Sequence, residues 1–470
     1  MQKSKFNFYS ALLLVMLFAA CRMGKDYQRP DIPQPAQFGK TAPSDSSVAD
    51  MEWKRFFSDA TLQQLIAHAL ENSYDIQLAV KRVEEARAYA RQAKVNWVPA
   101  IQAMANASTT FPSENSLNGI SLKQFLQTDH IEDYTLGLGL QWEIDIWGKL
   151  RRQREAAQAD YLESYEASRA VQTALVADIA SSFFNLLMLD AQLAVARRNL
   201  TLGDSIVQIM QLQKQAGVVS ELAIQQATAQ RQQAALLIPQ LEQQIAIQEN
   251  TIRILSGDLP SGIERNVQLS SFTVWENLPT GIPAAMISRR PDVRASEMAL
   301  VGANARVGVA QANMYPSLNI TAQGGLNAYK AADWFSWPGS LFGTAAGALA
   351  QPVFQRRALK TQREVAMLQR DQAAIAFKQT ALNAIGEVTN ALVRIDKLKL
   401  QHEIAEERVG TLQAAIRNAE LLFKSGMADY LEVITAQSNL LQAELDLANI
   451  ERDQLSAIVE LYRSLGGGWK

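Results

Sequence analysis

The stretch YTLGLGLQWEIDI, Tyr134–Ile146, alternates large apolar residues with small or polar ones at a period of two. In an extended chain, its tyrosine, leucine, tryptophan and isoleucine side chains share one face. Threonine, glycine, glutamine and acidic residues share the other. This alternation predicts a β-strand with one apolar face. Two environments would satisfy it: a soluble sheet with one buried face, or a transmembrane barrel whose exterior meets lipid.

Three further stretches predict the partner strands. Ser317–Gln323 repeats the alternation more weakly, whereas Ile101–Thr109 and Leu341–Gln351 are rich in alanine and glycine. Four strands are too few to close a barrel around water, and an open sheet edge in lipid leaves backbone groups unpaired at several kcal/mol each. If the strands span a membrane, we therefore expect the chain to need partner subunits.

Loops join the strands of each pair. Residues 110–133 are polar and contain Pro112 and Gly119, and residues 327–340 contain Trp334 and Trp337. Tryptophan there suits an aromatic belt at a membrane surface, although a packed loop tip would also use it.

The chain repeats itself with a period of about 210 residues, much longer than the repeats of solenoid proteins. The matching pairs are ARAYARQAKVNWVPAIQA around Pro99 with ANARVGVAQANMYPSLNITA around Pro316, DIWGKLR from Asp145 with PVFQRRA from Pro352, and QKQAGVVSELAIQQATAQ around Gly217 with LFKSGMADYLEVITAQSN around Gly426. They keep one order along the chain, so we interpret them as a duplication.

Long helices follow each strand pair. Residues 150–212 contain no proline and one glycine, and their apolar residues recur at helical spacing. A second helical run, Glu221–Leu255, follows a break at 216–220. The second half repeats the plan with helices at Leu359–Phe423 and Asp429–Leu465. The glycine-centred breaks predict two antiparallel hairpins.

The N-terminus reads as an export signal. Lys3 and Lys5 precede the apolar run Phe6–Ala20, which ends in small residues directly before Cys21. Cys21 is the only cysteine in the chain. A lone cysteine at this place is typical of a bacterial lipoprotein, with a covalent lipid on Cys21. An ordinary signal peptide with an incidental cysteine is the alternative.

Composition excludes several function classes. The chain has 45 Lys+Arg against 47 Asp+Glu, so no global charge points to nucleic acid. The three histidines are scattered, without metal-ligand spacing, and no phosphate loop, nucleophile elbow or dinucleotide motif occurs. We therefore expect neither an enzyme nor a bound cofactor.

A resemblance is carried by the segment IPAAMISRRPDVRASEMALVGANARVGVAQANMYPSL, Ile282–Leu318. Further stretches carry it too: GKDYQRP after Cys21, LQQLIAHALENSYDIQLA from Leu62, WEIDIWGKLRRQ from Trp142 and LYRSLGGGW ending at Trp469. Together they resemble the outer membrane efflux protein family. The closer likeness is to its NodT-type lipoprotein branch, which serves resistance-nodulation-division pumps.

The resemblance implies a fold that is mainly α with membrane β. Long periplasmic helical hairpins would form an α-barrel, and four transmembrane strands per protomer would close a twelve-stranded barrel in a homotrimer. The implied partners are a periplasmic membrane-fusion adaptor, an inner-membrane resistance-nodulation-division pump and outer membrane lipid. Arg289–Arg294 is expected to cap and dock a helix, because Pro291 suits the first helical position and Asp292 the positive end of the helix dipole.

Candidate site residues lie at the two hairpin turns. By the resemblance, the turns are the periplasmic tips that contact the adaptor and form the closed entrance, and their residues are Gly217, Val218, Ser220, Gly426, Met427 and Asp429. Glu432 lies about one turn further on, where the family has an acidic constriction that would favour cations. A solvated helix carboxylate is the plainer interpretation of Glu432.

These observations divide the chain into a signal peptide (1–20), a lipidated tail (21–58), a first repeat (59–256), a connecting segment (257–283), a second repeat (284–466) and a C-terminal tail (467–470). The predicted function is a passive outer membrane conduit that exports small molecules. Two alternatives stay open: a duct for polypeptides resembling type I secretion, and a lipid-tethered coiled-coil scaffold without a pore.

Overall fold

The fold is described from a computed structural model. It describes residues 23–33, 35, 37–38, 47–272, 279–281 and 283–469, so the predicted signal peptide and Cys21 lie outside the described residues. The chain forms two compact units. Unit 1 comprises residues 1–30, 84–162 and 298–375, and unit 2 comprises residues 31–83, 163–297 and 376–470.

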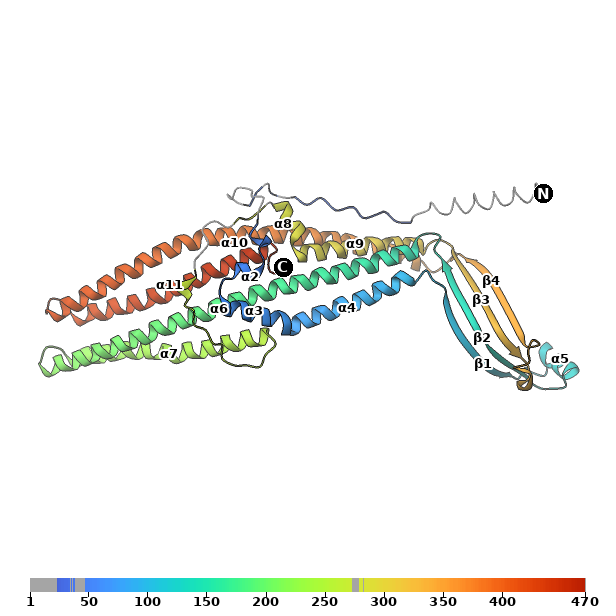
Figure 1. The fold of residues 1–470 in the computed structure, drawn as a ribbon, viewed down its shortest axis with the longest axis horizontal. Coiled ribbons are helices and arrows are strands. Elements are labelled where there is room, and N and C mark those ends of the chain that lie inside the picture. Colours follow the sequence, from blue (N-terminus) through green and yellow to red (C-terminus); the bar gives the residue numbers. More distant parts are fainter. Residues whose placement is uncertain are drawn as a thin grey trace. The chain divides into compact units, whose positions relative to one another are not determined.

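Unit 1 contains a four-stranded antiparallel sheet in the order β1-β2-β3-β4 (Figure 1). The strands are β1 (Ala100–Thr110), β2 (Ile131–Ile144), β3 (Ser317–Ala328) and β4 (Leu341–Ala350). All four predicted strands are therefore present. β3 runs beyond its predicted end because Gly324 and Gly325 stay in register with β2.

The register places like residues opposite one another. Leu136 faces Leu326, and Trp142 faces Ile320 across the β2–β3 pair. Because side chains alternate between faces, one face of the sheet is apolar, and the opposite face carries Gln141, Thr321 and similar polar residues. Within the described residues, the outer edges of β1 and β4 have no partner strand. The sheet therefore has one apolar face, and within the described residues neither of its two outer edges pairs with another strand.

The predicted loop 110–133 is partly wrong, because it contains helix α5 (Leu117–Phe125). Ser116 caps the helix by accepting a hydrogen bond from the Gly119 amide at 3.1 Å. A Cβ on Gly119 would lie 2.1 Å from the Ser113 carbonyl oxygen. Gly119, which suggested a loop, instead permits this close approach inside a helix.

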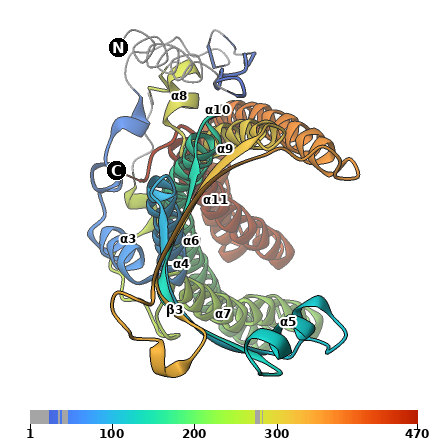
Figure 2. The same cartoon turned by 90° about the vertical axis from the view of Figure 1, so that its right-hand side faces the viewer.

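Two long hairpins lie mainly in unit 2, and only the first parts of their longer helices belong to unit 1 (Figure 1). Their helices are α6 (Lys149–Gln215), α7 (Glu221–Leu255), α10 (Ala358–Lys424) and α11 (Tyr430–Ser464). α6 and α10 each have 67 residues, and α7 and α11 each have 35. This match supports the duplication read from the sequence. Seen end-on, the hairpins lie along a curved layer (Figure 2).

Shorter elements complete the fold. They are η1 (Val48–Asp50), α2 (Trp53–Phe56), α3 (Ala60–Asn72), α4 (Tyr74–Val95), η2 (Leu269–Ser271), α8 (Pro283–Arg289), α9 (Pro291–Ala312) and η3 (Ala331–Asp333). In the unit 2 core, the rings of Tyr462 and Phe56 stack 4.0 Å apart. His68 Nε2 lies 2.9 Å from Asp258 Oδ2.

One described helix, α6, has an 18-residue window apolar enough to cross a membrane, but 61% of that window is buried inside the protein. This is also the composition of a core helix, so the window by itself does not assign α6 to a membrane.

Candidate functional site

The two hairpin tips turn in the same way. Gly217, two residues after the end of α6, has a φ of +71°, and Gly426, two residues after the end of α10, has a φ of +73°. The Gly217 amide donates to the Lys214 carbonyl at 2.9 Å, and the Val218 amide donates to the Gln213 carbonyl at 2.9 Å. The second tip repeats this pair of hydrogen bonds. Glycine is favoured at both ends because this backbone conformation penalises a side chain.

The structure brings the two tips together. A buried cluster joins them and consists of Ile206, Met210, Ala227, Ala419 and Val433. The Tyr430 hydroxyl of α11 also donates to Gln226 Oε1 of α7. The predicted tip residues of both repeats therefore belong to one end of unit 2 (Figure 1).

Apolar side chains remain exposed at this end. Val218 is 68% exposed and Met427 is 73% exposed. Ser220 caps α7 by accepting from the Ala223 amide at 3.3 Å, whereas the side chain of Asp429 makes no capping hydrogen bond to α11. A contiguous patch of exposed apolar groups, and not a single one, marks a surface that binds another protein.

Glu432 lies in the first turn of α11, and its side chain is exposed. The residue at the corresponding place in the first repeat is Ala223, 209 positions earlier. An acid at this position is therefore a feature of the second tip alone. Glu221, the acid in the first turn of α7, instead pairs with Lys214.

Arg290 is a buried residue of Ile282–Leu318, the segment that carries the resemblance. Its side chain is 5% exposed and lies 2.6 Å from Asp292 and 2.8 Å from Glu387. It also donates to the Ser464 carbonyl at 3.0 Å, which joins the start of α9 to the end of α11. α9 begins at Pro291. The predicted docking of this segment and the predicted first helical position of Pro291 agree with these contacts.

The charge of Arg290 acts on Asp292. Burial alone would raise the pKa of the Asp292 carboxyl, but its hydrogen bond to Arg290 and the Arg290 charge hold that pKa below its usual value. Asp292 therefore stays ionised at the positive end of α9, which serves the docking of the helix.

Aromatic side chains gather at both ends of the sheet. At one end, Trp142 Nε1 donates to the Trp97 carbonyl at 2.8 Å, and the rings of Trp147 and Tyr315 lie 5.1 Å apart. At the other end, Trp334 packs against Tyr134 at 5.3 Å, while Trp337 in the same loop is exposed. In transmembrane barrels, aromatic residues gather in this way at both membrane interfaces and form two girdles. The sequence indicated only the loop end.

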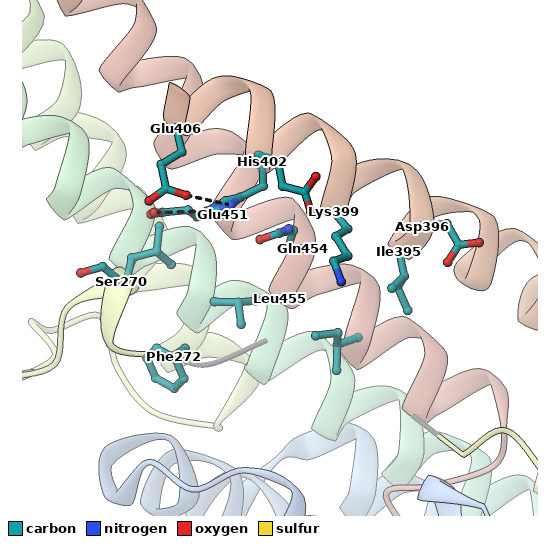
Figure 3. Close-up of a pocket in the computed structure, with 13 residues that line it drawn as sticks. Ser270, Phe272, Ile395, Asp396, Lys399, His402, Glu406, Glu451, Gln454 and Leu455 are labelled. Carbon is teal, nitrogen blue, oxygen red and sulfur yellow. Dashed lines mark ion pairs between the residues drawn. The ribbon is translucent and has the colours of Figure 1, made fainter. Parts of the chain in front are cut away.

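An open cavity of about 560 Å³ lies where α10 and α11 meet the connecting segment (Figure 3). His402 lies 4.0 Å from Glu406 and 3.9 Å from Glu451. Burial raises the pKa of Glu451, and the His402 charge opposes that rise. The spacing of His402 and Glu406 was visible in the sequence, but Glu451 comes from the other helix. The described residues contain no group of three or more His, Cys, Asp or Glu side chains arranged for a metal.

The chain is similar to known proteins in both sequence and structure. The family model for outer membrane efflux protein matches residues 65–258 and 282–467. The solvent efflux pump outer membrane protein SrpC of Pseudomonas putida is 30% identical over 99% of both chains, and the cation efflux system protein CusC of Escherichia coli is 27% identical over 97% of this chain and 98% of its own. The solved structure of the outer-membrane channel OprN superposes with a TM-score of 0.87 at 26% identity, covering 96% of this chain and all of that one.

The likeness spans the sheet and both hairpins, and the predicted fold class, mainly α with a four-stranded membrane sheet, is confirmed. The chain is an outer-membrane efflux channel subunit, not an enzyme, and it belongs to the outer membrane efflux protein family.

Proposed function

We propose that three copies of the chain assemble into a passive conduit across the outer membrane. The observation that carries this proposal is the one-faced sheet whose outer edges, on β1 and β4, lack partner strands among the described residues. In lipid, those edges need hydrogen-bonding partners. Pairing β4 of one copy with β1 of the next satisfies both edges, and three copies of a four-stranded sheet give the twelve strands of a closed barrel.

The hairpins then form the periplasmic part of the conduit, and their tips dock a periplasmic adaptor. The exposed Val218 and Met427 support this docking. An inner-membrane pump supplies the energy, because the sequence contains no nucleotide-binding motif.

Glu432 forms the acidic constriction at the entrance. Its exposed position in the first turn of α11 and the lack of an acidic counterpart at Ala223 support a ring of one carboxylate per subunit. Such a ring attracts cations and repels anions.

The cargo consists of small molecules. The relatives' names refer to solvent efflux for SrpC and to cation efflux for CusC. Those names favour small cargo over the polypeptides of a type I duct, and the strand register favours a channel over a scaffold. A diacylglyceryl lipid on Cys21, outside the described residues, adds an anchor to a structure that its barrel already holds in the membrane.

Conductance tests the conduit and its constriction together. Purified trimers in planar bilayers should conduct, and Glu432→Ala should weaken cation preference and block by divalent cations. Glu221→Ala is the matched control, because Glu221 is the acid at the other tip and pairs with Lys214. Unchanged selectivity in Glu432→Ala would reduce Glu432 to a solvated helix carboxylate. A wild-type trimer without conductance would remove the conduit.

A further inference from the structure

A buried arginine holds the start of the N-terminal tail in unit 1. Arg152, in the first turn of α6, has a side chain only 3% exposed. Its guanidinium donates to the Met23 carbonyl at 3.2 Å, to the Gly24 carbonyl at 3.1 Å and to Asp26 Oδ1 at 2.8 Å. A fourth contact, 2.6 Å to Glu155 Oε2 on α6, fixes the orientation of the guanidinium. Charged hydrogen bonds of this kind are among the strongest in proteins.

Two glycines let the tail approach the helix closely. A Cβ on Gly24 would lie 2.8 Å from Cα of Gly308 in α9, and a Cβ on Gly308 would lie 2.9 Å from Cγ of Arg152. Gly24 also has a φ of +82°, which few other residues adopt. Asn304, one turn before Gly308, donates to the Lys25 carbonyl at 3.0 Å. Residues 23–26 therefore pack closely against a shallow groove, defined here by Arg152 of α6 and by Asn304 and Gly308 of α9, while the side chains of Lys25 and Asp26 stay exposed.

The groove lies next to the sheet. The Met23 amide donates at 3.3 Å to the carbonyl of Trp147, which stands between the end of β2 and the start of α6. Trp147 Nε1 in turn donates at 2.7 Å to the carbonyl of Pro316, directly before β3. Met23 is thus bonded to the end of the sheet that carries one of the aromatic girdles.

We infer that Arg152 is the positioning residue of the lipid anchor. It holds residues 23–26 so that a lipid on Cys21 enters the bilayer at the sheet end marked by Trp147. Cys21 stands two positions before Met23, so their Cα atoms can be no more than about 7 Å apart. The inference rests on the proposed lipidation of Cys21. Without the groove, the acyl chains would hang on a longer free tether and their position relative to the barrel would vary.

Trypsin cleavage after Lys25 measures whether the groove holds the tail. Cleavage there removes Cys21–Lys25 with its lipid from the mature trimer, and intact mass reports the loss. Cleavage needs local release of the chain, so its rate follows the population of the released state. We expect Arg152→Ala to raise the rate about tenfold or more, since it removes three charged contacts to the tail.

Two further variants separate the tail from the body of the protein. Arg306→Ala is the matched control, because Arg306 also lies in unit 1 and pairs with Asp160 instead of the tail. Asp26→Ala removes one contact from the tail side, where Asp26 is 72% exposed, and should give a smaller increase without disturbing the helices. Heat resistance of the trimer on a gel should stay unchanged in Asp26→Ala.

The cleavage rates of the variants decide whether Arg152 holds the tail. Equal cleavage rates for wild type, Arg152→Ala and Asp26→Ala would overturn the inference. An equal increase in Arg306→Ala would also overturn it, since the effect would then be general loosening. If intact mass shows no acyl chains on Cys21, the anchor fails, and the cleavage rates still decide whether Arg152 holds the tail.

Discussion

Arg290 Nη1 lies 2.8 Å from Glu387 Oε2, and this contact joins the start of α9 to the middle of α10, 97 positions along the chain. The guanidinium is almost fully buried and also serves Asp292 and the Ser464 carbonyl. Arg290→Ala would leave two carboxylates and a helix end without their shared donor. We expect a loss of about 3 kcal/mol in the free energy of unfolding. This is the lower end of the cost of breaking a buried ion pair, because both carboxylates keep some access to water.

Arg289→Ala tests whether that loss is specific. Arg289 is the preceding residue and pairs with Asp50 at 3.2 Å, where both side chains are partly exposed. Its loss should cost less than about 1 kcal/mol. Thermal unfolding of the purified trimers in detergent compares the two variants. Equal shifts in unfolding temperature would show that the loss does not depend on the contacts of Arg290.

Tyr462 should make unit 2 sensitive to alkali. Burial, together with the nearby Glu52 charge, raises the pKa of Tyr462 to about 12. In the unfolded chain, tyrosine titrates near pH 10. The folded state keeps the proton longer, so this contribution to stability is complete below about pH 10 and is lost as the pH rises towards about 12.

Tyr462→Phe isolates that contribution. The variant loses the hydrogen bond from the Tyr462 hydroxyl to the Met51 carbonyl, 2.7 Å long, which should cost about 1 kcal/mol at neutral pH. Its stability should then fall less steeply than that of wild type between about pH 10 and 12. Unfolding measured across that range gives the answer, and parallel alkaline slopes would contradict it.

The two faces of β2 should tolerate charge differently. Leu138 lies on the apolar face near the middle of the strand, and Gln141 lies on the polar face. Leu138→Arg should cost about 3 kcal/mol in each copy, as for a cation placed near the bilayer midplane, and trimers should be lost. Gln141→Arg should assemble and change ion selectivity. Gel analysis of trimers and bilayer recording test the pair. Assembly of both variants would argue against a lipid-facing Leu138.

Two helix-ending glycines should respond differently to substitution. Gly217 has a φ of +71° and nothing within 4 Å of an added Cβ, whereas a Cβ on Gly257, at a φ of +81°, would lie 2.4 Å from the Asn72 carbonyl oxygen. Gly217→Ala should lower the free energy of unfolding by about 1 kcal/mol, which is the cost of holding an alanine backbone at positive φ. Gly257→Ala adds a clash with backbone and should cost about 3 kcal/mol or more. Hydrogen exchange at the tip and thermal unfolding measure the two; equal costs would disprove the distinction.

Much of the fold was predictable because its signals are local. The alternation in Tyr134–Ile146 and the helical spacing in 150–212 each report one element. The glycines of the two turns ended helices where expected, since a positive φ favours glycine. Helix α5 was missed because Gly119 suggests a loop until its contact with Ser113 is known.

The site was only partly predictable. The tip residues stood out because the two repeats align there, and the structure packs both tips into one cluster. The partners of Arg152 and Arg290 could not be found in this way. Met23 is 129 positions from Arg152, and only the folded chain brings Glu387 to Arg290. Periodicity identifies elements, but contacts between distant charges depend on the packing of those elements.

The equal lengths of α6 and α10, and of α7 and α11, restrict how such a chain can evolve. Deleting one residue from α10 alone would turn every later side chain by about 100° and draw one tip back by about 1.5 Å relative to its neighbour. A marked length difference between the repeats falls instead in the loops, where 329–340 is eight residues shorter than 111–130. Insertions and deletions are therefore expected to survive between the strands, whereas the hairpins should change length only by matched, near-heptad steps in both halves.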